Sequence, residues 1–147
     1  MKGIGVRHTA IVVGSMETVL PFYRDLLEME ICAEFKDSSD YVQAITDVPG
    51  ANIWTVNLKF VSGASIQLQQ YLSHPQEAPA SKSACDRGLN HIAVEVDNID
   101  ALYEKLKASG ISFHAPPTVS TDGVAKVTYC RDPEGTMIEL VEMLRSS

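Results

Sequence analysis

The sequence has few cysteines, little positive charge and no long apolar run, and each shortage excludes a class of protein. Cys32, Cys85 and Cys130 show no CxxC spacing or close pairing, so we expect reduced, inert thiols rather than a disulfide framework. The net charge of −7 leaves no cationic excess to neutralise phosphates, which argues against a nucleic acid or an anionic membrane as partner. No apolar run approaches the roughly 20 residues that a membrane-spanning helix needs.

The composition and size suit one soluble domain. Hydrophobic residues make up 45% and charged residues 21% of the 147 residues, which is typical of a globular chain with a core of its own, so we expect a single domain over residues 1–147. Residues 1–8 lack the apolar stretch of a signal peptide. We therefore expect a cytoplasmic protein.

One pattern occurs twice along the chain. The first copy opens on His8 and closes on the letters GASIQL, and the second opens on His91 and closes on GTMIEL. A shift of 83 residues brings His8 onto His91, whereas a shift of 72 brings Gln67 onto Glu139, so the first copy carries 11 additional residues. A duplicated unit that contains one nitrogen donor and one oxygen donor can assemble a four-ligand metal site on a pseudo-twofold axis.

Each copy begins with an alternating strand, at 8–13 and at 91–96. Period-two spacing puts the histidine on the sheet face opposite the isoleucine and valine side chains. A helix follows in each copy, capped by Ser15 or Thr18 in the first and by Asp97 or Asn98 in the second. A start at Ser15 would predict a kink at Pro21, because proline has no N–H to donate inside a helix.

Three further strands are predicted after each helix, separated by turn signals rich in Gly, Pro and Asp. They are 31–35, 54–61 and 65–71 in the first copy, with 41–45 as an extra strand, and 112–115, 125–130 and 137–143 in the second. Each copy is therefore a predicted βαβββ module, 4–72 and 89–147, joined by a linker at 73–88. The expected fold class is α+β, with the two modules forming a curved mixed sheet, shaped as a cup, and the helices outside.

This repeated pattern resembles the vicinal-oxygen-chelate superfamily. The motifs that carry the resemblance are Phe22-Tyr23 followed by Leu26-Leu27, the letters GLNHIA at 88–93, and DPEG at 132–135 shortly before IEL. The superfamily includes glyoxalase I, methylmalonyl-CoA epimerase, extradiol dioxygenases and bleomycin or fosfomycin resistance proteins. The resemblance covers the chain apart from the linker and residues 37–53. It implies the fold without selecting a reaction, since this fold hosts several chemistries.

The resemblance also implies a metal site. In the metal-using members, the first and last strands of each module supply the ligands, which correspond here to His8, Gln67, His91 and Glu139. Gln67 stands where glyoxalase-like members have glutamate, and it is similar to the methylmalonyl-CoA epimerase pattern. Two imidazoles and two oxygen donors suit a divalent ion such as Zn, Ni, Co, Mn or Fe.

The function implied is that of a divalent-metal-dependent lyase or isomerase of the glyoxalase type. Such an enzyme stabilises an enediolate or enolate of a small substrate that chelates the ion through two oxygens. Glu139 is the candidate catalytic residue, because in glyoxalase-like chemistry this carboxylate can leave the ion and act as base. One alternative is an Fe(II) extradiol-type dioxygenase that uses His8, His91 and Glu139 as a 2-His-1-carboxylate site. Another is a metal-free small-molecule binding or resistance protein.

Other polar residues are weaker candidates. Gln69 shares the face of Gln67 and is the second choice of oxygen donor, and Glu95 shares the face of His91 and is a substitute base. His74 and His114 have no counterpart in the other copy, so we expect them at the surface or the rim. The arginines that hold glutathione in glyoxalase I have no clear match, which argues against glutathione as substrate. We expect a homodimer, because curved open sheets leave edges that a partner can cover.

Overall fold

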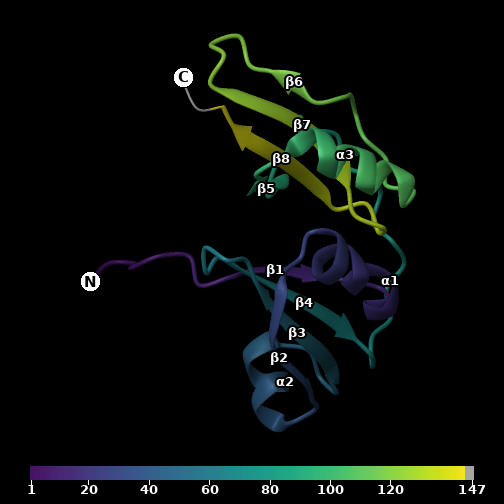
Figure 1. The fold of residues 1–147 in the computed structure, drawn as a ribbon. Helices are drawn as coiled ribbons and strands as arrows, with labels where there is room; N and C mark the ends of the chain where they lie inside the picture. The colour runs from purple at the N-terminus through teal and green to yellow at the C-terminus, as the bar shows by residue number, and fades with distance from the viewer. Residues whose placement is uncertain (145–147) are drawn as a thin grey trace. The chain divides into compact units, whose positions relative to one another are not determined.

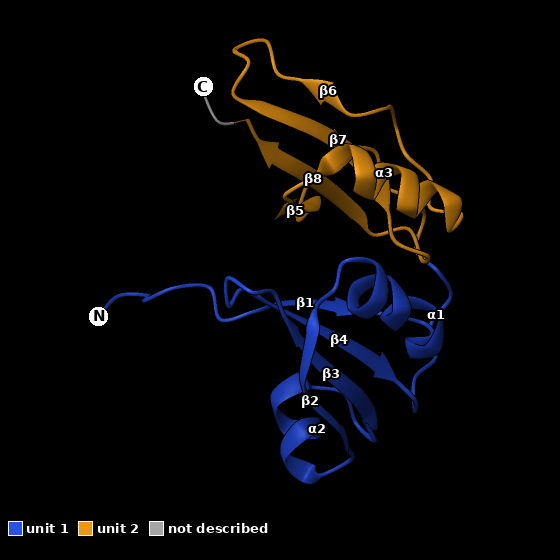
Figure 2. Cartoon of the chain, viewed as in Figure 1, with its two compact units in different colours: residues 1–78 blue, residues 79–147 orange. Residues whose placement is uncertain are grey.

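The computed structural model describes residues 1–144 and divides into two compact units, Met1–Ala78 and Pro79–Ser147 (Figure 2). The boundary falls inside the predicted linker, 73–88, and the last three residues of the predicted second module, 145–147, lie outside the described residues. Each unit contains a four-stranded mixed sheet, with strand order β1-β4-β3-β2 in unit 1 and β5-β8-β7-β6 in unit 2. The prediction of an α+β fold built from two repeated modules is confirmed.

The elements follow the chain in the order that Figure 1 shows. Unit 1 contains β1 (Thr9–Val12), α1 (Met16–Pro21), a π-helical turn η1 (Phe22–Leu26), β2 (Glu30–Asp37), α2 (Asp40–Thr46), β3 (Ile53–Lys59) and β4 (Ser65–Tyr71). Unit 2 contains β5 (His91–Glu95), α3 (Ile99–Ala108), β6 (Thr118–Val119), β7 (Ala125–Arg131) and β8 (Met137–Met143).

The sheets repeat the same register. β1 runs parallel to β4 with Ala10 opposite Gln67, and β5 runs parallel to β8 with Ala93 opposite Glu139. The bounds of β3 and β4, shifted by 72 residues, coincide with those of β7 and β8. The duplication seen in the letters therefore extends to the hydrogen-bonded pairing of the strands.

Each main helix is capped in the same way. Ser15 accepts a hydrogen bond from the backbone N–H of Thr18 at 3.2 Å, and Asn98 accepts one from that of Ala101 at 3.0 Å. These bonds satisfy one of the N–H groups that the first turn of a helix leaves without a partner. The structure thus selects Ser15 and Asn98 from the predicted alternatives.

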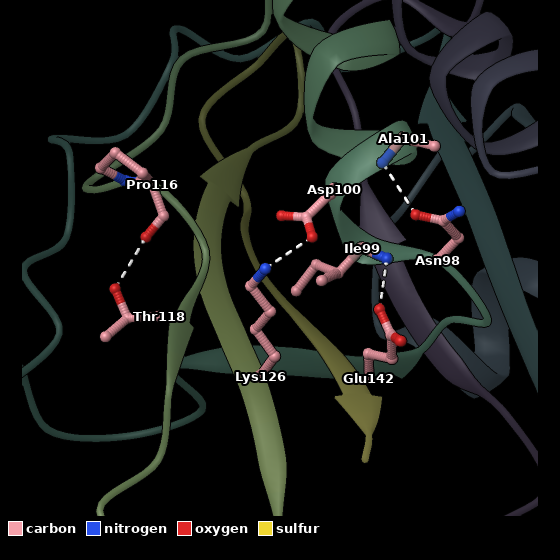
Figure 3. A network of polar contacts seen from close by, with 8 residues as sticks. All are labelled: Asn98, Ile99, Asp100, Ala101, Pro116, Thr118, Lys126 and Glu142. Atoms are coloured by element: carbon pink, nitrogen blue, oxygen red, sulfur yellow. Dashed lines mark hydrogen bonds and ion pairs between the residues drawn. The ribbon is translucent and has the colours of Figure 1, made fainter. Parts of the chain in front are cut away.

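A second contact ties each helix start to the last strand of its unit. The backbone N–H of Met16 donates to Gln70 Oε1 at 2.8 Å, and that of Ile99 donates to Glu142 Oε2 at 2.8 Å (Figure 3). The side chains of Gln70 and Glu142 therefore project toward the helix-covered face of each sheet, as the buried Ile66 and Leu68 of β4 also do. Because alternate residues of a strand point to opposite faces, Gln67 projects to the other face, and Glu139 does so in unit 2.

Pro21 ends the regular part of the first helix. It has no N–H to donate, so the hydrogen-bond pattern widens after it into η1, where Leu27 N–H donates to the Phe22 carbonyl at 3.0 Å. The helix thus starts after Ser15, and the hydrogen-bond pattern changes at the residue after Pro21, where a kink is the expectation.

Two of the predicted strands are wrong. The segment 41–45 is helical and forms most of α2, because Ser39 caps it by accepting from the N–H of Val42. The segment 112–115 makes one isolated bridge, Phe113 to Cys130, and the edge strand of unit 2 is instead β6. Pro116 and Pro117 lie between the two pieces, and prolines cannot donate to a sheet, so the edge is interrupted there.

The main helix of each unit covers one face of its sheet: α1 packs against β4, and α3 packs against β8. The buried apolar side chains of the strands lie beneath them and include Leu68 in unit 1 and Ile138 and Leu140 in unit 2. Among residues 1–144, the helices lack the length and apolar character required to cross a bilayer.

Candidate functional site

The second unit brings two of the predicted ligands into contact. His91 opens β5 and Glu139 lies in the middle of the neighbouring strand β8, on the face that α3 does not cover. His91 Nε2 and Glu139 Oε2 are 3.2 Å apart, and the side chains are 33% and 19% exposed. A half-exposed imidazole beside a carboxylate offers one nitrogen and one oxygen donor to a ligand from solvent.

Three further polar side chains surround this pair. Asn90 Oδ1 lies 3.1 Å from His91 Nδ1, which orients the ring so that Nε2 faces Glu139. The ring of Tyr129 meets His91 edge-on at 5.3 Å between centroids and stacks on His114 at 6.0 Å. Burial raises the pKa of the Tyr129 phenol, and the negative charge of Glu139 and its hydrogen bond with that phenol raise it further. Tyr129 lies directly opposite Glu139 in the strand register, so the two side chains share one face of the sheet.

The first unit presents the equivalent positions. Gln67 lies on β4 on the face opposite α1, and its Nε2 donates to Asn57 Oδ1 on β3 at 2.9 Å. His8 is exposed and directly precedes β1. In the register of that strand, His8 falls opposite Ser65, two residues before Gln67, just as His91 lies opposite Met137, two residues before Glu139. Each unit therefore holds one histidine and one oxygen-bearing side chain in the same strand register, and only the pair in unit 2 is in contact.

A family model described as the Glyoxalase/Bleomycin resistance protein/Dioxygenase superfamily matches residues 5–140. The chain belongs to this superfamily. The match spans both modules and includes all four predicted ligand positions.

Individual relatives of this superfamily match over nearly their whole length. The protein YaeR of Escherichia coli K12, named as uncharacterized, is 28% identical over 143 residues, which cover 93% of this chain and 95% of YaeR. A probable lactoylglutathione lyase of Synechocystis is 24% identical over 135 residues, with 92% of each protein covered. The crystal structure of a glyoxalase family protein from Bacillus cereus superimposes with a TM-score of 0.90 at 19% identity, over 99% of this chain and 97% of that one. That likeness shows the glyoxalase fold.

The donor atoms of each unit fit half of a divalent-metal site of the kind that glyoxalase superfamily members use. Imidazole nitrogen, carboxylate oxygen and amide carbonyl oxygen all bind borderline divalent ions. Within residues 1–144, no group of three or more His, Cys, Asp or Glu side chains is assembled to hold an ion. Unit 1 thus contains two candidate donors, His8 and Gln67, and unit 2 contains two, His91 and Glu139.

The weaker candidates lie elsewhere. Gln43, another polar residue of the first unit, lies in α2 and accepts a hydrogen bond from the N–H of Gly50 at 2.7 Å. Glu95 is exposed at the end of β5, and His74 bonds to its neighbour Ser73 at 2.8 Å. His114 is exposed, as expected for a surface position, but its ring stacks on Tyr129 beside the His91–Glu139 pair.

Asn57 and Tyr129 lie beside the proposed ligands but are not predicted from the sequence. They lie directly opposite Gln67 and Glu139 on the neighbouring antiparallel strands. The signal that could have found them is the 72-residue shift of the closing strands, which also brings Asn57 onto Tyr129. Their residue types differ, so a comparison of letters alone does not mark them as equivalent.

Proposed function

We propose that this protein is a divalent-metal-dependent lyase or isomerase of the glyoxalase type. The substrate class is a small α-hydroxy, α-keto or acyl-thioester compound that presents two neighbouring oxygens. The observation that carries the proposal is the contact of His91 with Glu139 at 3.2 Å, together with the equivalent register of His8 and Gln67 in the first unit. The lactoylglutathione lyase name of the Synechocystis relative supports a reaction of this class.

The proposed ligands are His8, Gln67, His91 and Glu139, with Zn, Ni, Co, Mn or Fe as the ion. A bound divalent ion would supply Lewis-acid stabilisation of negative charge on the substrate oxygens. The four ligands carry one negative charge between them, since Gln67 is a neutral amide. Part of the charge of the ion therefore remains available to the substrate.

Glu139 is the proposed proton carrier. Its carboxylate lies within reach of a substrate on the open face of the sheet, and it is half-buried beside His91 and Tyr129. A carboxylate in such a place can take a proton from the carbon next to a carbonyl group and return it to the neighbouring atom. The Tyr129 hydroxyl and the His91 ring limit its rotation and keep it aimed in one direction.

Metal content is the first test of the proposal. Protein purified without chelators or a histidine tag should contain close to one divalent ion per chain, or take one up on reconstitution. Glu139→Ala should lose both the ion and turnover, because it removes a ligand and the proton carrier at once. Turnover can be followed as exchange of the substrate hydrogen with deuterium from D2O by NMR. Full metal occupancy in Glu139→Ala would contradict the assignment of this residue as a ligand.

The same preparation separates the proposal from its two alternatives. An Fe(II) dioxygenase would consume oxygen with a catechol after anaerobic loading with iron, and a lyase or isomerase would not. A metal-free binding protein would contain well below one ion per chain and show no thermal shift with Ni, Co, Mn or Zn.

We further propose a cytoplasmic homodimer that acts on a small molecule. The three free thiols support a reducing compartment, and the open edges of the two sheets support association with a second copy. Sedimentation equilibrium at micromolar concentration would test the dimer.

A further inference from the structure

Each proposed oxygen ligand lies directly opposite a polar residue of the neighbouring strand. Gln67 on β4 pairs with Asn57 on β3, and Glu139 on β8 pairs with Tyr129 on β7. Directly opposed residues of antiparallel strands have side chains on the same face and in contact. The two partners occupy the same position of the repeated module, 72 residues apart, although one is an amide and the other a phenol.

In the first unit, the partner fixes which end of an amide is presented. Gln67 Nε2 donates to Asn57 Oδ1 at 2.9 Å, so the amide nitrogen is engaged and Oε1 is left as the atom that can bind a cation. Without an acceptor at this position, the amide can rotate and present its NH2 group instead. That group has no lone pair to offer an ion and carries partial positive charge.

In the second unit, the partner is a donor. The ligand there is a carboxylate, which only accepts hydrogen bonds, and Tyr129, whose phenol can donate one, lies directly opposite it on β7. The ring of Tyr129 is itself held, edge-on against His91 at 5.3 Å and stacked on His114 at 6.0 Å. The ring is therefore held on the same face of the sheet as Glu139, and its hydroxyl is the donor that this position offers to the carboxylate.

We propose that Asn57 and Tyr129 are the positioning residues of the two oxygen ligands. Asn57 is a hydrogen-bond acceptor for the amide of Gln67, and Tyr129 is a hydrogen-bond donor for the carboxylate of Glu139. This inference rests on the proposed function. Neither residue touches the ion or the substrate in this assignment. Groups that orient metal ligands in this way typically change metal affinity by about 10–100-fold when they are removed.

The test is the dissociation constant for Zn and Ni, measured by competition with a chelating dye. Tyr129→Phe removes the hydroxyl and keeps the ring that packs on His91, and Asn57→Ala removes the acceptor. Each should weaken metal binding by about 10–100-fold. Asn57→Asp is the matched control, because a carboxylate accepts the same hydrogen bond from Gln67, and it should bind metal at least as tightly as the wild type.

A second measurement separates positioning from structural damage. The melting temperature of the chelator-treated variants should match that of the wild-type protein, and the side-chain amide NMR signals of Gln67 should move in Asn57→Ala but not in Asn57→Asp. Wild-type metal affinity in both Asn57→Ala and Tyr129→Phe would overturn this inference alone. Failure of Asn57→Asp to restore binding would overturn the acceptor role. A wild-type protein that takes up no ion would overturn the proposed metal centre and this inference with it.

Discussion

The last strands of the two units differ in charge although they share one register. Gln67 and Gln70 of β4 stand where β8 has Glu139 and Glu142. Gln70 and Glu142 have the same hydrogen-bonding role in their units, because an amide oxygen and a carboxylate oxygen can each accept a hydrogen bond from the N–H at the helix start. Among the four proposed ligands, the negative charge therefore comes from Glu139 of the second unit.

Cys130 offers a test of core packing at a single residue. Its side chain is fully buried in β7, and burial, followed by the charge of Asp132, raises the pKa of its thiol to about 12. The thiolate is the reactive form, so this thiol should be inert at pH 8. Cys32 and Cys85 are exposed. A maleimide or disulfide reagent should therefore label these two at pH 8 and the third only after unfolding in guanidinium.

The Cys130→Ala variant is the control for that experiment. It should keep the labelling of Cys32 and Cys85 in the folded protein and lose only the additional labelling that follows unfolding. Rapid labelling of three thiols in the folded wild-type protein would mean that β7 opens to solvent, contrary to the packing described.

How far the sequence predicts the site depends on what identifies each residue. The four proposed ligands can be picked out because they fall at the ends of two matching sequence patterns. Asn57 and Tyr129 are not, because their importance comes from the strand opposite each of them. The pairing of strands depends on turn lengths and on which face is buried, which a comparison of residue types does not contain.

Among the elements, the helices attach to the sheets through a contact that can be tested. Ile99 N–H donates to Glu142 Oε2 at 2.8 Å, where the positive end of the α3 dipole meets a carboxylate (Figure 3). Glu142→Ala removes the acceptor and should lower the free energy of unfolding by about 1.5–3 kcal/mol. Glu142→Gln keeps an oxygen, as Gln70 does in unit 1, and should lower it by only about 0.3–1 kcal/mol.

Urea unfolding of the two variants, with linear extrapolation to water, measures the difference. Equal stability of Glu142→Ala and Glu142→Gln would show that the helix start does not depend on this oxygen.

The elements also show where sequence reasoning fails. The strands 65–71 and 137–143 are predicted at their observed bounds because period-two alternation and flanking turns agree there. The segment 41–45 is a short, largely apolar run, which does not distinguish a strand from a helix, and the cap at Ser39 decides for α2.

The 11 additional residues of the first copy lie between α1 and β3, in the segment that contains α2. Val42 of α2 packs with Ala51 and Ile53, with Tyr71 at the edge of this cluster. Ile53 and Tyr71 are opposed residues on the face that also bears Asn57 and Gln67. The insertion therefore covers one end of that face in unit 1, and unit 2 has no matching helix among its described residues.

For the whole molecule, the division of donors between two units leads to a prediction about metal stoichiometry. Each unit supplies one histidine and one oxygen donor, and two donors alone hold a divalent ion weakly, since catalytic zinc sites have three protein ligands and structural sites four. The double variants His8→Ala/Gln67→Ala and His91→Ala/Glu139→Ala should therefore each lose nearly all bound metal.

If each unit instead bound its own ion independently, each double variant would keep half of the metal content of the wild-type protein. Metal analysis by mass spectrometry after gel filtration, with protein concentration from amino-acid analysis, distinguishes the two. Circular dichroism of the variants serves as the folding control, because all four positions lie on open faces or ahead of a strand and their removal leaves the buried cores intact. Half-occupancy in both double variants would mean that each unit binds an ion without the other, and the four-ligand centre would then be wrong.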